Sequence, residues 1–252
     1  MFSRTIPCLA AAIAAIVLFQ VPAASQGTFA TIRAEHFTVR YMQGVPEAEA
    51  QRVLALLQED YDTLTSQLGL ELKPPLEVRM YDSPSRYKSE IKMGKDVPPA
   101  MYVRGTLHVL EPVPAGALDV ALRYQFALGL LGQTAQYSCP VWLREAFAVY
   151  HSGRMPDLSS PGSVTLASFS DLSQELEEAQ TPVERNDVDF VLGRTMEFFV
   201  QKYGERKAYG VFKEFAVTPT VEKVFKKVFE EEFPDIEKAW SKFVAVKPRK
   251  AK

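Results

Sequence analysis

Cysteine is scarce in this chain, which has two among its 252 residues. Cys8 lies in the apolar stretch near the start, and if that stretch is removed on export, Cys139 is the one cysteine left. A disulfide within the mature chain is then excluded. The neighbours of Cys139, which are proline, valine and tryptophan, favour a buried thiol over one that pairs with another chain.

An excess of positive charge is also missing. The 29 lysines and arginines stand against 31 aspartates and glutamates, giving a formal net charge of −2. A nucleic-acid-binding domain would show a basic patch or stripe. The basic run at residues 247–252 is a short terminal tail of the kind that is usually solvated. The sequence therefore predicts no nucleic-acid partner, and it does not indicate an oligomeric state.

The apolar run Ile6–Val21 carries no charge but is shorter than the roughly 20 residues that a membrane-spanning helix needs. Arg4 precedes it and small residues follow it up to Ser25, which is the order typical of a secretory signal peptide. We therefore predict that residues 1–25 are cleaved and that the protein is periplasmic or secreted. Contact with a membrane is expected only through an uncleaved signal segment.

The chain up to residue 113 alternates between strand and helix patterns. Strands are predicted at His36–Met42, Leu76–Met80 and Met101–Leu110, the last as one bent strand or a hairpin. Between the first two lies a long amphipathic helix, Pro46–Leu68, which Gly69 ends. A short helix, Ser83–Met93, follows the second strand. These elements predict a small leading β-sheet covered by a long helix.

Residues 114–246 are predicted to be mostly helical. The predicted helices are Leu118–Gln133, Val141–His151, Val188–Tyr203, Lys207–Ala216, Val221–Phe229 and Pro234–Phe243. The segment Arg154–Ser170 is rich in turn formers and is predicted to be a loop. Strands first and helices after indicate the α+β class. We expect a leading subdomain over 26–113, a helical subdomain over 114–246 and a basic tail over 247–252.

The first two of these helices carry a recognisable order of residue types. One contains Tyr124-Gln125-Phe126-Ala127-Leu128, and the next runs Pro140-Val141-Trp142-Leu143-Arg144-Glu145-Ala146-Phe147-Ala148-Val149-Tyr150. This layout resembles the peptidase MA-like family of gluzincin metallopeptidases. In that family a buried helix carries His-Glu-x-x-His, and a Pro-x-Trp-Leu-x-Glu-Gly-x-Ala-x-Tyr segment supplies the third zinc ligand. The resemblance extends over most of the mature chain and implies a zincin-like helical half.

The departure from the family lies where its chemistry would be. Tyr124 and Leu128 stand at the two histidine positions, and Gln125 stands at the general-base glutamate. Leucine cannot bind metal, a tyrosine hydroxyl titrates near 10, and an amide cannot take a proton from water. Phe190 falls where the family often has a tyrosine. Only Glu145 survives, so the resemblance implies a degenerate motif without a catalytic residue, a metal or another cofactor.

The three histidines do not offer a replacement metal site. No two of them are four residues apart, and none lies in the helix of Tyr124. We interpret His36 and His108 as structural. His151 follows Glu145 by six residues, which is about 120° around a helix, so it could line the same cleft without sharing a metal with Glu145.

Without zinc, a buried Glu145 needs hydrogen bonds or a cation. The Tyr124 hydroxyl, the Gln125 amide and either Arg123 or Arg194 are the candidates. We hypothesise that this polar cluster replaces the metal as the tie between the two helices.

Three functions remain open at this point. The preferred one is an exported non-catalytic pseudo-peptidase that binds a peptide, a cell-envelope component or a protein partner. The predicted cleft residues are Tyr124, Gln125, Trp142, Glu145, His151 and Phe190, and the Met101–Leu110 strand could be an edge for an extended peptide. The alternative is an active gluzincin-type hydrolase, zinc-dependent or built from Glu145, His151 and tyrosines. The third is a structural domain whose cleft is filled by side chains. The site rather than the scaffold decides among them.

Overall fold

The computed structural model describes residues 29–69, 75–92, 97–134, 138–155, 158, 161 and 166–245. The predicted signal peptide and the basic tail lie outside these residues, as do several residues of the Arg154–Ser170 loop. Over the described ranges, no helix combines the length and the apolar character that crossing a membrane requires.

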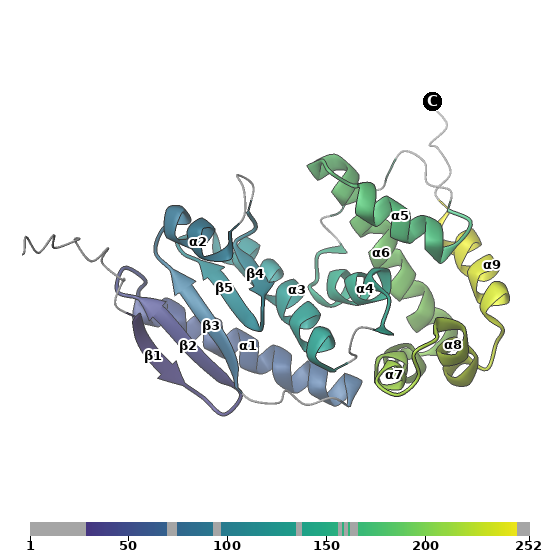
Figure 1. The fold of residues 1–252 in the computed structure, drawn as a ribbon, viewed down its shortest axis with the longest axis horizontal. Coiled ribbons are helices and arrows are strands. Elements are labelled where there is room, and N and C mark those ends of the chain that lie inside the picture. Colours follow the sequence, from purple (N-terminus) through teal and green to yellow (C-terminus); the bar gives the residue numbers. More distant parts are fainter. Residues whose placement is uncertain are drawn as a thin grey trace, which may run out of the picture.

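The described residues form a five-stranded sheet at one end of the molecule (Figure 1). The strands are β1 (Phe29–Arg33), β2 (Phe37–Met42), β3 (Leu76–Tyr81), β4 (Ala100–Val103) and β5 (Thr106–Leu110), in the spatial order β1-β2-β3-β5-β4. The central pairs β2–β3 and β3–β5 are parallel, and both edge strands are antiparallel to their neighbours. Parallel pairs require crossovers, which α1 (Glu47–Leu68) and α2 (Pro84–Ile91) supply.

The sequence left Met101–Leu110 open as one bent strand or a hairpin, and the structure shows the hairpin, with Arg104 and Gly105 both at positive φ in its turn. Strand β1 was not predicted. It lies at the sheet edge with no residue fully buried, so it lacks the apolar alternation that identifies a half-buried strand.

The rest of the described chain is helical, which confirms the α+β class. The helices are α3 (Ala115–Thr134), α4 (Val141–His151), α5 (Phe169–Glu178), α6 (Pro182–Tyr203), α7 (Glu205–Phe215), α8 (Val221–Phe229) and α9 (Phe233–Val244). Helix α3 lies against β4 and β5, and α4 packs between α3 and α6 (Figure 1). These contacts join the sheet to the helical half through α3.

Helix α5 and the first turns of α6 were missed by the sequence prediction. Both helices begin at a capping box, in which Ser168 pairs with Asp171 and Thr181 with Glu184. A serine or threonine three residues before an acidic residue is the sequence signal that could have located both helix starts.

Aromatic side chains join the start of α4 to the last helices. Trp142 stacks on Phe169 with ring centroids 4.3 Å apart, and Phe169 lies 4.5 Å from the fully buried Trp240. The Trp240 indole N–H donates to the Thr195 hydroxyl at 2.9 Å. Next to this cluster, burial raises the pKa of the Cys139 thiol to about 12, which confirms the prediction of a buried cysteine.

Candidate functional site

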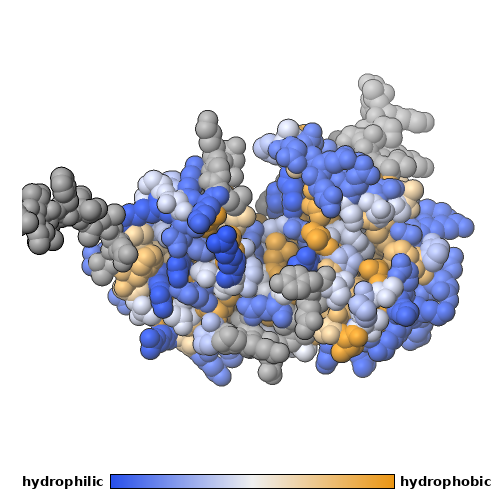
Figure 2. Space-filling model, in the orientation of Figure 1, coloured by the Kyte–Doolittle hydropathy of each residue, from blue (hydrophilic) through white to orange (hydrophobic). Residues whose placement is uncertain are grey.

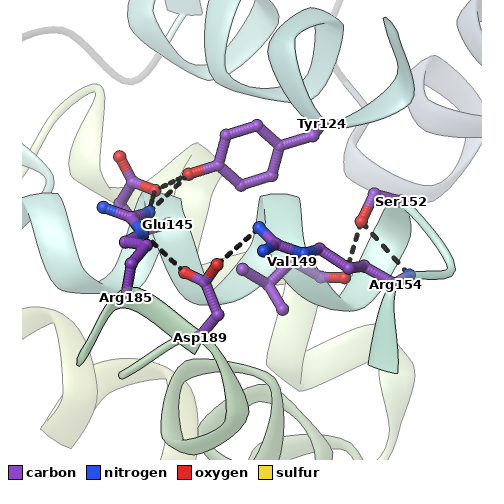
Figure 3. Close-up of polar contacts among 7 residues, drawn as sticks. All are labelled: Tyr124, Glu145, Val149, Ser152, Arg154, Arg185 and Asp189. Carbon is purple, nitrogen blue, oxygen red and sulfur yellow. Dashed lines mark hydrogen bonds and ion pairs between the residues drawn. The ribbon is translucent and has the colours of Figure 1, made fainter. Parts of the chain in front are cut away.

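Tyr124 and Glu145 face each other across the α3–α4 contact (Figure 3). The Tyr124 hydroxyl donates a hydrogen bond to Glu145 Oε2. One guanidinium nitrogen of Arg185, on α6, reaches both groups, at 2.8 Å from Tyr124 Oη and 2.9 Å from Glu145 Oε2. Glu145 therefore has a hydrogen-bond donor on one side and a cation on the other.

Arg185 is itself fixed by Asp189, one turn further along α6. Arg185 Nε donates to Asp189 Oδ1 at 2.8 Å, and the Asp189 side chain is completely buried. Arg154, which follows α4, forms an ion pair with the other oxygen, Nη1 to Oδ2, at 2.5 Å. The five side chains form one network that links α3, α4, α6 and the segment after α4 (Figure 3).

Burial determines the protonation states in this network. Burial, reinforced by the charge of Glu145, raises the pKa of Tyr124 well above its ordinary value. The hydroxyl therefore stays protonated and donates a hydrogen bond to Glu145. Burial also raises the pKa of Asp189, although Arg185 and Arg154 oppose that rise. For Arg185, burial lowers the pKa, but Tyr124, Asp189 and Glu145 outweigh it and the pKa is raised. The guanidinium thus stays charged beside the carboxylates.

Zinc does not fit this donor set. A catalytic zinc site uses three imidazole or carboxylate ligands at about 2 Å. Around Glu145 stand a protonated tyrosine hydroxyl and a guanidinium, and Leu128 packs against the apolar core. In the part of the chain that the structure describes, no group of three or more His, Cys, Asp and Glu side chains is placed to hold a metal ion.

The cation beside Glu145 is neither of the two expected from the sequence. Arg123 Nε lies 3.6 Å from Asp60 Oδ1, because Arg123 directly precedes Tyr124 and points to another side of α3. Arg194 pairs with Glu197 and lies over the Phe243 ring. The signal that could have identified Arg185 is its four-residue spacing to Asp189, an acidic residue between two apolar ones.

Gln125 does not join the cluster but holds the edge strand β4. Its side-chain oxygen accepts a hydrogen bond from the Tyr102 backbone N–H at 2.9 Å. Four residues later, Gly129 leaves room for the Tyr102 ring, since a Cβ there would lie 2.8 Å from it. Four residues further, Gln133 donates to the Tyr102 hydroxyl at 3.1 Å. One stripe of α3 thus fixes the whole Tyr102 side chain.

Of the Met101–Leu110 segment, which was predicted as a possible edge for an extended peptide, β4 lies at an edge of the sheet, whereas β5 is interior, between β3 and β4. The Tyr102 N–H of β4 bonds to Gln125, so one donor that an added strand would use is already occupied. That this edge binds a peptide remains a prediction.

His151 is separate from Glu145. Its ring stacks on Phe147, and Nε2 lies 4.0 Å from Asp60 Oδ1 on α1. His36 stacks on Tyr61, and Nδ1 of the buried His108 shares a hydrogen bond with the Tyr81 hydroxyl at 2.8 Å. The last two contacts agree with structural roles for His36 and His108.

The Asp60–His151 pair predicts two opposite pH dependences of stability. Burial raises the pKa of Asp60 to about 6 even though Arg123 lowers it, and burial, with Arg123, lowers the pKa of His151 to about 4. The unfolded values are about 4 and 6.5. Because folding raises the pKa of Asp60, its contribution to the free energy of unfolding is most favourable at low pH and is lost as the pH rises from about 4 to about 6. Because folding lowers the pKa of His151, its contribution is most favourable at high pH and is lost as the pH falls from about 6.5 to about 4.

We therefore expect Asp60→Asn to remove the pH dependence that Asp60 causes and to retain the one that His151 causes. Relative to the unchanged protein, the free energy of unfolding of this variant should rise by roughly 1–3 kcal/mol from pH 4 to 6.5. Urea unfolding at several pH values measures it. His151→Phe is the matched variant and should show the reverse slope. Equal slopes in both variants would rule out this assignment.

A pocket of about 580 Å³ opens beside Glu145. Its lining residues are Pro140, Val141, Trp142, Glu145, Phe169, Ser170, Ser173, Leu176, Glu177, Arg185, Val221, Glu222, Phe233 and Glu237. Of the predicted cleft residues, the structure brings Trp142 and Glu145 to this pocket. Tyr124 reaches it only through Glu145, whereas Gln125, His151 and Phe190 lie elsewhere. That these residues bind a ligand remains a prediction.

No known protein family matches the chain by sequence, and no curated protein matches it. Among solved structures, the chain is similar to a mutant M1 zinc metallopeptidase from Deinococcus radiodurans bound to a Tyr-Ser-Ala substrate. The identity is 16% and the TM-score 0.41, over 88% of this chain and 53% of that one. A two-domain M1 zinc metallopeptidase mutant bound to L-tryptophan gives 16% and 0.40, over 88% and 52%. The chain spans about half the length of each, and likeness at this level assigns neither a family nor an activity.

Proposed function

We propose that this chain is an exported, non-catalytic protein that keeps a metallopeptidase-type scaffold and binds a peptide or protein partner in the pocket beside Trp142. One observation carries the proposal. Glu145, the one residue of the zinc motif that survives, is bound by the Tyr124 hydroxyl and the Arg185 guanidinium. The Glu145 carboxylate, which is 16% exposed, is satisfied in this way without a metal.

The position of the general base supports the same conclusion. Gln125 stands where the family resemblance implies a glutamate, and its oxygen already accepts the Tyr102 N–H. A side-chain amide cannot remove a proton from water, and this one is aimed at the edge strand. His151, the remaining titratable candidate, contacts Asp60 instead of Glu145. The alternative of an unconventional hydrolase built from Glu145 and His151 therefore loses support, because the two side chains contact different partners.

The open pocket favours a binding role over a purely structural one. A structural domain was expected to fill the cleft with side chains such as Leu128, Phe126 and Phe190. The space of about 580 Å³ beside Glu145 instead falls within the range of small-ligand pockets, roughly 300–1,000 Å³. Its mixed apolar and charged lining is typical of such sites.

Elemental analysis of the purified chain without residues 1–25 tests the proposal. We expect less than about 0.1 zinc per chain and a melting temperature that EDTA changes by less than about 1 °C, because no metal contributes to folding. The same chain incubated with excess zinc and then dialysed is the control. Stoichiometric zinc whose removal lowers the melting temperature would contradict the proposal and favour the zinc-dependent hydrolase.

A further inference from the structure

The pocket beside Glu145 has an apolar wall. Trp142 and Phe169 stack in parallel at its base, with an interplanar angle of 2°. Around them Val141, which is 55% exposed, and the half-buried Phe233 present apolar surface to the open space. Apolar side chains are visible among charged ones on the helical half in Figure 2. A ligand of this pocket gains free energy by covering that surface.

The same lining carries an excess of negative charge. It contains Glu145, Glu177, Glu222 and Glu237, against Arg185 as the one cation. Arg185 is already committed to Glu145 and Asp189, and Glu237 accepts the Phe169 backbone N–H at 2.9 Å. Glu177 and Glu222 are exposed and form no ion pair within the described ranges. The carboxylates of Glu177 and Glu222 can therefore each form an ion pair with a cationic group of a ligand.

We propose that this pocket binds a basic peptide segment. An aliphatic or aromatic side chain of the peptide covers Val141 and Phe233, and a neighbouring lysine or arginine places its charge at Glu177 and Glu222. The inference rests on the proposed function and deepens it, since it names the ligand chemistry of the same pocket. The charge balance of the lining disfavours an anion, and the apolar wall disfavours a bare metal ion or a small polyamine without an apolar body.

The binding site does not use the sheet edge. The pocket lining contains no residue of the edge strand β4, so the peptide is not held there as an added strand. Recognition instead comes from side chains on α4, α5, α8 and α9, which surround the pocket. We therefore expect affinity to depend on peptide side chains and on salt, with little dependence on peptide backbone conformation.

Fluorescence anisotropy with a labelled hexapeptide of alternating lysine and leucine tests the proposal on the chain without residues 1–25. We expect saturable binding that the double substitution Glu177→Gln and Glu222→Gln weakens roughly tenfold, as loss of two exposed charge pairs does. The matched control, Glu175→Gln with Glu178→Gln, removes the same charge from exposed positions outside the lining. It should change the affinity by less than about twofold.

A second test variant and its control examine the apolar wall. Val141→Ser should weaken binding roughly threefold to tenfold, because it removes exposed apolar surface from the pocket. Val183→Ser, at a valine that is 71% exposed and outside the lining, should leave binding unchanged. A peptide with glutamate in place of lysine should not bind.

Absence of saturable binding, or equal weakening by both double substitutions, would overturn the inference. The two failures are distinguishable. A metal-free chain that does not bind the peptide overturns the ligand assignment alone, whereas stoichiometric structural zinc overturns the non-catalytic function on which it rests.

Discussion

Replacing Arg185 by methionine should lower the free energy of unfolding by about 1.5–3 kcal/mol, the range of hydrogen bonds to charged groups, because the part-exposed Arg185 is one of the two cations beside the completely buried Asp189. Arg185 bonds Glu145, Asp189 and the Tyr124 hydroxyl at 2.8–2.9 Å. Methionine fills a similar space but leaves Glu145 without a cation and Asp189 with Arg154 alone. Urea unfolding at pH 7 measures the loss.

Arg194→Met is the matched control, because Arg194 lies on the same helix with similar exposure but pairs with the part-exposed Glu197 rather than with a completely buried carboxylate. Its loss should be about 1 kcal/mol or less. Adding Glu145→Gln to Arg185→Met should recover part of the stability, since the bare carboxylate is then neutral. If Arg185→Met and Arg194→Met cost the same, the network around Glu145 does not hold the helices together.

Rebuilding the zinc motif should fail as long as Arg185 remains. The triple variant Tyr124→His, Gln125→Glu, Leu128→His supplies the ligands that the family resemblance implies, with Glu145 as the third. Arg185 lies 2.9 Å from Glu145 Oε2, so a zinc ion on that oxygen would be within roughly 5 Å of the guanidinium. Two unit charges 4 Å apart at an effective dielectric of about 20 repel by about 4 kcal/mol, and the double charge of zinc outweighs the longer distance, so we take this value as the minimum.

That repulsion corresponds to about a thousandfold in zinc affinity. We therefore expect zinc, measured by competition with a chromophoric chelator, to bind the triple variant about a thousandfold more weakly than the same variant with Arg185→Gln. The triple variant with Arg194→Gln is the control and should behave like the triple variant. Equal zinc affinity with and without Arg185 would show that this arginine does not exclude a metal. If neither form binds zinc while both stay folded, α3 and α4 do not match the family geometry.

Much of the fold follows from local sequence patterns. The alternation around Val39 and Val78, and the spacing of Val53, Leu57 and Leu64, predicted β2, β3 and α1 because periods of 2 and 3.6 depend only on neighbouring residues. In β1 no residue is fully buried and the apolar residues do not alternate, so the sequence pattern does not identify this strand. The starts of α5 and α6 were encoded in their capping boxes, although the prediction omitted α5 and began α6 only at Val188.

The sequence by itself determined that Leu128 cannot bind a metal, that the Gln125 amide cannot take a proton from water and that Tyr124 would be a poor ligand, because these properties depend on the chemistry of each side chain alone. It also determined that Glu145, if buried, needs partners. The tertiary structure decided which partners it has. Arg185 is 40 residues from Glu145 and 61 from Tyr124, and Gln125 is 23 from the backbone group that it binds. Such pairs depend on where helices cross, and no local period encodes where α6 meets α4.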